Sequence, residues 1–145
     1  MRTAVKPPPE EVFEVFGEAA FVESVTPRFM RLRVRQIGLA VGDKIDVEFR
    51  VLFRIRWVST IVSEERAPDA IRFVDERVGD DATPWPLATW QHHHGFLRSP
   101  SGGTIIVDAP QFTVRPRILA PIAYPLLWFS FVIRKGPYRR RFGSS

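Results

Sequence analysis

The feature that most constrains the fold is a period-two alternation of apolar and polar side chains along the middle of the chain. It is clearest where Ile45, Val47, Phe49, Val51 and Phe53 alternate with Asp46, Glu48 and Arg50. Successive side chains of an extended backbone point to opposite sides, so such a segment has one buried face and one solvated face. The pattern predicts strands over residues 45–53, 30–35, 54–64, 70–78, 89–97 and 104–114.

Short turn-forming segments separate these strands. Val41-Gly42-Asp43, Ala67-Pro68-Asp69 and residues 99–103 contain the glycine, proline and small polar residues that favour tight turns. Consecutive strands joined in this way pair antiparallel. Residues 79–86 are polar and contain two prolines, which predicts an exposed loop that could form the rim of a pocket.

Helices are expected at both ends of the chain. Two short helices are predicted at residues 8–17 and 18–25, after a very short strand at residues 2–5. Residues 118–133 carry no charge and include Trp128, Phe129 and Phe131. A membrane span needs about 20 apolar residues, and Pro121 and Pro125 would each cost roughly 3 kcal/mol in a helix interior. A helix packed on the sheet is therefore the first expectation, with an interfacial anchor or a membrane span as alternatives.

The composition predicts one globular domain covering residues 1–145. It is 45% hydrophobic and 26% charged, and the length suits a single core. The absence of cysteine excludes disulfides and thiolate metal sites. The first residues lack the pattern of a secretory signal, so a cytoplasmic location is expected.

The positive charge is concentrated at the carboxyl end. Residues 109–145 contain seven basic side chains and no acidic one, whereas the rest of the chain is nearly neutral. We expect residues 134–145 to form a flexible, solvated basic tail. Contact with anionic lipid or nucleic acid is the alternative, and no specific nucleic-acid partner is predicted.

The segment Trp90-Gln-His-His-His-Gly-Phe96 mixes aromatic and titratable side chains. In a strand, Trp90, His92, His94 and Phe96 share one face, and His93 lies on the other. Such a surface suits the wall of a small-molecule pocket. The residues predicted to bind a ligand are Phe49, Phe53, Trp57, Phe73, Trp90, His92, His94, Phe96, Phe112 and Trp128. For Phe49, Phe53, Trp57, Phe73 and Trp90, core packing is the default interpretation and ligand contact is the alternative.

The two histidines also allow more specific chemistry. His92 or His94, paired with Asp75 or Asp108, could serve as a general acid or base. Two histidines two residues apart could also bind zinc, but only with a further ligand from Asp75 or Asp108. Hydrogen-bonded wall residues are the expectation, so no metal and no cofactor is predicted.

The ordered set of these segments resembles the SRPBCC (START-like) superfamily. The matching residues are Thr26-Pro27, Trp57, Phe73-Val74-Asp75-Glu76, Trp90, His92, His94, Phe96, Gly103-Thr104 and Asp108, and the likeness covers residues 5–134. It is greatest to the bacterial ligand-binding or polyketide cyclase/dehydrase-like branch.

This resemblance implies an α+β helix-grip fold, in which a curved antiparallel sheet of six to seven strands wraps around a carboxyl-terminal helix. It also implies a cavity that binds a lipid, polyketide or aromatic compound. The alternatives are a cyclase or dehydrase that uses His92 or His94, and a peripheral membrane or nucleic-acid protein. The short first strand and the prolines of the last helix depart from the pattern, so the cavity could be open or covered by a second copy in a homodimer.

Overall fold

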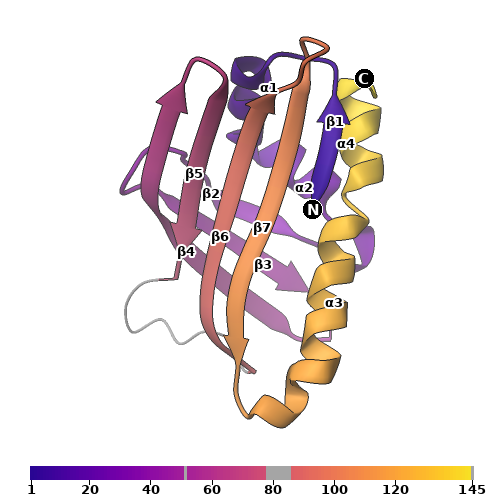
Figure 1. Cartoon of the computed structure of the whole chain (residues 1–145). Helices are drawn as coiled ribbons and strands as arrows, with labels where there is room; N and C mark the ends of the chain where they lie inside the picture. The colour runs from indigo at the N-terminus through magenta and orange to yellow at the C-terminus, as the bar shows by residue number, and fades with distance from the viewer. Residues whose placement is uncertain (51, 78–85, 145) are drawn as a thin grey trace.

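A computed structural model describes residues 1–50, 52–77 and 86–144. Its seven strands form one antiparallel sheet in the order β1-β7-β6-β5-β4-β3-β2. The strands are β1 (Arg2–Val5), β2 (Arg33–Gln36), β3 (Lys44–Arg50), β4 (Arg54–Ala67), β5 (Ala70–Glu76), β6 (Leu87–Arg98) and β7 (Thr104–Val114). The predicted meander and its strand count are confirmed, and together with the terminal helices they give the α+β helix-grip arrangement (Figure 1).

The helices lie at the two ends of the chain. They are α1 (Pro9–Phe16), α2 (Ala19–Val25), α3 (Ala120–Val132) and α4 (Lys135–Phe142), with short 3-10 turns at Arg28–Met30 and Arg117–Leu119. The crowded prolines and Glu10 and Glu11 of the first turn favour the start of α1. In Figure 1 the strands curve around α1 and α2, while α3 and α4 follow one another beside β7 and β1.

Several boundaries differ from those predicted. Strand β2 begins only at Arg33, because residues 28–30 form a 3-10 turn and Arg31 has a left-handed backbone with φ of 42°. Strand β3 ends at Arg50, which leaves Phe53 in the β3–β4 connection. The loop predicted at residues 79–86 lies outside the described residues except for Pro86.

The core lies between the sheet and the helices α1, α2 and α4. Phe13 and Phe16 of α1 pack edge-on against Phe96 of β6, with ring centroids 5.8 and 4.8 Å away. Tyr138 and Phe142 of α4 are also buried there, at 1% and 7% exposed. Residues 135–142 are therefore a packed helix and not the flexible tail that their charge predicts, since two aromatic side chains anchor them.

The helix predicted at residues 118–133 is present but is only partly packed on the sheet. Pro121 lies in the first turn of α3, where a missing N–H costs nothing, and Pro125 lies inside the helix. Only Phe131 of this helix is fully buried. Much of the apolar surface of α3 thus faces outward.

Candidate functional site

Strands β5, β6 and β7 bring four titratable side chains together on the inner face of the sheet. Asp75 lies opposite His92 in the β5–β6 register, and His94 lies opposite Asp108 in the β6–β7 register. Because side chains two residues apart share a face, the three strands place both histidines between the two carboxylates. This juxtaposition confirms the shared face predicted for His92 and His94.

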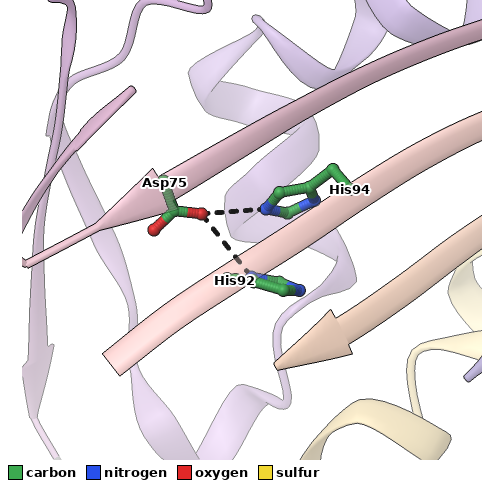
Figure 2. A group of neighbouring side chains, drawn as sticks. All are labelled: Asp75, His92 and His94. Carbon is green, nitrogen blue, oxygen red and sulfur yellow. Dashed lines mark hydrogen bonds and ion pairs between the residues drawn. The ribbon is translucent and has the colours of Figure 1, made fainter. Parts of the chain in front are cut away.

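The two imidazoles contact both carboxylates. His94 Nε2 lies 3.0 Å from Asp75 Oδ2 and forms a hydrogen bond, and His92 Nδ1 lies 3.7 Å from the same oxygen (Figure 2). On the other side, Asp108 Oδ1 lies 3.4 Å from His92 Nε2 and 3.5 Å from His94 Nδ1. The ring centroids are 3.7 Å apart.

Helix α4 completes this cluster. The Tyr138 hydroxyl donates a hydrogen bond of 3.1 Å to Asp108 Oδ2. Sequence pattern alone does not point to Tyr138, because this residue lies in a basic segment of the kind that is usually solvated. The only local signal was a lone aromatic residue after Gly136-Pro137.

The cluster is sealed from solvent. The side chains of Asp75, His92, His94 and Asp108 are 5%, 7%, 11% and 0% exposed. Within the part of the chain that the structure describes, three of their buried atoms have no hydrogen-bond partner: His92 Nε2, His94 Nδ1 and Asp108 Oδ1. Unpaired buried polar atoms are costly, so these three atoms require an explanation.

The surroundings shift the pKa values of the His92 and His94 imidazoles in opposite directions. Burial, followed by the charge of His94, lowers the pKa of His92 to about 4. Burial also lowers the pKa of His94, but the carboxylates of Asp108 and Asp75 outweigh it and the net pKa is raised. His92 is thus neutral near pH 7, whereas His94 binds a proton more readily than a free imidazole.

The two carboxylates are ionised in this environment. Burial raises the pKa of Asp75 and Asp108, yet the neighbouring imidazoles outweigh it, so that both net pKa values are lowered. Burial and the nearby Asp108 charge raise the pKa of Tyr138 well above its usual value, which keeps it a hydrogen-bond donor. The cluster can therefore hold a proton or a cation, but its burial keeps a substrate out of reach.

The residues predicted to bind a ligand are placed in three different settings. Phe73 and Phe96 belong to the core, and Phe73 stacks on His94 with centroids 4.2 Å apart. Phe53 and Trp128 are 77% and 67% exposed, so their side chains are mostly in solvent. The remaining aromatic residues are buried or half-buried: Phe49, Trp57, Trp90 and Phe112.

An open groove lies elsewhere, between α2 and the junction of α3 with α4. Its volume is about 630 Å³, and it is lined by Ser24, Val25, Thr26, Pro27, Arg28, Ile133, Gly136, Pro137, Arg140 and Arg141. None of the ten predicted ligand-binding residues lines it. Of its lining, Thr26-Pro27 belongs to the residues that carry the family resemblance, and Arg140 and Arg141 belong to the segment predicted to be a flexible basic tail.

Comparisons with known proteins find likeness at the level of fold. No family model and no curated protein matches the chain significantly. The solved structure of protein Ms6760 from Mycobacterium smegmatis superposes with a TM-score of 0.67 at 13% identity, covering 94% of this chain and 84% of that one.

Two other solved structures give the same result. A solution structure of a Staphylococcus epidermidis protein has a TM-score of 0.65 at 13% identity and covers 98% of this chain and 89% of that one. Ara h 8.0201 has a TM-score of 0.54 at 12% identity and covers 94% and 93%. The chain therefore has a helix-grip fold of the type that its sequence resemblance implied.

Proposed function

We propose that the protein binds a small molecule with an apolar body and an anionic group. The observation that carries this proposal is the groove between α2 and the α3–α4 junction. Its volume of about 630 Å³ is within the range typical of ligand sites, about 300–1,000 Å³. The binding place differs from the cavity between sheet and helix that the resemblance implied, and His92 and His94 have no part in it.

The lining of the groove defines the ligand class. Val25, Pro27 and Ile133 supply apolar surface, and Arg28, Arg140 and Arg141 supply positive charge. Guanidinium groups recognise a carboxylate or phosphate through paired hydrogen bonds. A fatty acid or an aromatic carboxylic acid fits this combination.

Binding of a fluorescent fatty acid to the full chain tests this proposal. Arg140→Gln should weaken binding about 5- to 30-fold, on the order of 1–2 kcal/mol, because the anionic group loses a charged partner. Arg139→Gln is the matched control, since Arg139 lies on the same helix and does not line the groove. Equal binding by both variants, or equal affinity for the corresponding fatty alcohol, would contradict the proposal.

The exposed side of α3 favours a second candidate function, docking on an anionic membrane surface. Ile118, Ile122, Leu126, Trp128 and Phe129 are all between 54% and 80% exposed. Ile118, Ile122, Leu126 and Phe129 recur at helical spacing and form an outward stripe. Contiguous exposed apolar surface of this kind marks an interaction site.

The charge around this stripe favours an anionic lipid surface as its partner. Arg115 and Arg117 precede α3, and Arg134, Lys135 and the arginines of α4 follow it. Two copies meeting through this surface would bring like charges together, whereas anionic lipid headgroups attract cations at about 1 kcal/mol each. Tyr124 and Trp128 are side chains that favour the membrane interface.

The docking is interfacial rather than spanning. By length and apolar composition alone, the helical stretch Arg117–Phe142 could cross a bilayer. However, Tyr138 and Phe142 are anchored in the core. Helix α3 itself has 13 residues and extends only about 20 Å, less than the roughly 30 Å of a hydrocarbon layer.

Co-sedimentation with vesicles tests this second function. Binding should be strong with phosphatidylserine-containing vesicles, weak with pure phosphatidylcholine, and reduced by salt. Leu126→Glu should reduce it at least tenfold, whereas Val62→Glu, an exposed apolar position on β4, should leave it unchanged. Equal binding to vesicles with and without anionic lipid would contradict membrane docking. A stable dimer of the wild type that Leu126→Glu dissociates would contradict it as well.

A further inference from the structure

We propose that Asp75, His92 and His94 form a binding site for a divalent transition metal, with zinc as the best match. One atom of each residue contributes: Asp75 Oδ2, His92 Nδ1 and His94 Nε2 (Figure 2). These three atoms lie within 4.8 Å of one another. Two imidazoles and one carboxylate are a ligand set that zinc accepts, with a fourth position left for water.

The spacing of the ligand atoms fits a metal ion. Zinc bonds of about 2.0–2.1 Å in tetrahedral geometry place two ligand atoms about 3.3 Å apart. The distances from Asp75 Oδ2 to His94 Nε2 and His92 Nδ1 are 3.0 and 3.7 Å, on either side of this value. Small side-chain shifts would therefore admit the ion without a change in the strand register.

Metal binding would also explain the three buried atoms without hydrogen-bond partners. A metal on His92 Nδ1 and His94 Nε2 leaves the ring protons on the opposite nitrogens, His92 Nε2 and His94 Nδ1. Both of these nitrogens face Asp108 Oδ1, at 3.4 and 3.5 Å. Each would then donate to that oxygen, and all three unpartnered atoms become satisfied together.

Asp108 and Tyr138 would serve as outer partners of the site. Carboxylates that accept the second ring proton of a metal-bound histidine fix its orientation and increase its basicity. Asp108 does this for both rings, while the Tyr138 hydroxyl holds its other oxygen.

Charge balance supports a divalent ion. Asp75 and Asp108 place two negative charges among side chains that are 11% exposed or less. Buried charges are stable only when they are compensated. A doubly charged cation between neutral imidazoles neutralises both carboxylates.

Titration of the EDTA-treated full chain with Zn²⁺, in competition with a coloured chelator, tests the site. One equivalent should bind and raise the melting temperature. Asp75→Asn and His94→Gln should abolish this binding, and Asp108→Asn should weaken it 10- to 100-fold. The matched control is His93→Gln, because His93 lies between the two ligands in sequence and pairs with Gln91 instead.

A second measurement uses only the wild-type protein, so it does not require any variant to fold. Ring nitrogen signals of His92 and His94 in the wild-type protein should shift when Zn²⁺ binds, while those of His93 remain in place. Absence of stoichiometric binding to the folded wild type would overturn the proposal, as would loss of binding in His93→Gln equal to that in His94→Gln. Neither result bears on the proposed binding of a fatty acid in the groove, because none of the residues that line the groove belongs to this cluster.

Discussion

At the scale of single residues, environment gives two neighbouring histidines different roles. His92 and His94 share a strand face and both contact Asp75 and Asp108. Burial and the charge of its neighbour lower the pKa of His92, whereas the two carboxylates raise that of His94. Inside a protein, a small difference in contacts shifts the pKa values of two neighbouring imidazoles in opposite directions.

The pKa of His92 predicts a loss of stability in acid for metal-free protein. Between the unfolded value of 6.5 and the folded value of about 4, the unfolded chain binds a proton at His92 that the native state does not. The contribution is complete above pH 6.5 and falls as the pH drops toward 4, by at most about 3 kcal/mol. The free energy of unfolding, measured with urea, should therefore fall more over this pH range for the wild type than for His92→Gln. Parallel pH profiles would contradict the buried, neutral state of His92.

Tyr138→Phe should destabilise the protein by about 1–3 kcal/mol, because it removes a donor from a buried carboxylate. Tyr124→Phe is the control. The Tyr124 hydroxyl donates to the Phe112 carbonyl at 3.3 Å at an exposed site, where water can replace it. Urea denaturation midpoints measure both effects, and equal values for the two variants would argue against a structural role for Tyr138.

At the scale of elements, close approach between strands depends on one glycine. Gly103 precedes β7, where a Cβ atom would lie 2.2 Å from the carbonyl oxygen of Val5 in β1. Nearby, the Thr104 hydroxyl donates to the carbonyl oxygen of Pro7 at 2.7 Å. The short first strand is thus fixed to the sheet edge by backbone contact that only glycine permits.

Gly103→Ala should lower the melting temperature by several degrees, because either β1 or the turn before β7 must move. Gly136→Ala provides a contrast. Its added Cβ would meet only the flexible end of Arg140, and alanine favours helix over glycine by about 1 kcal/mol. Thermal unfolding should therefore show loss in the first variant and little change or a gain in the second.

At the scale of the whole molecule, the carboxyl-terminal helices divide their roles between core and surface. Helix α4 inserts Tyr138 and Phe142 into the core, while α3 presents an apolar stripe to the outside. The inner sheet face is filled mainly by α1 and α2.

Removal of residues 135–145 should abolish cooperative folding, since two core aromatic side chains would be lost. The milder change Phe142→Ala should cost about 3–5 kcal/mol. Replacing Arg139, Arg140 and Arg141 by glutamine should instead keep the fold and weaken binding to phosphatidylserine vesicles. Circular dichroism and co-sedimentation separate the two effects, and a truncated chain that melts cooperatively would show that α4 is dispensable for folding.

Sequence pattern alone predicts most of the strands and helices and the strand face that His92 and His94 share. Alternation fixed the strands that carry Trp57, Phe73 and Trp90, and the two-residue spacing placed His92 and His94 together, because these patterns depend only on backbone geometry. Tertiary structure decided the rest. It brought Tyr138 to Asp108, folded residues 135–142 into a helix held by the buried Tyr138 and Phe142, and left Phe53 and Trp128 exposed. Packing between segments distant in sequence sets burial, and residue type alone does not encode it.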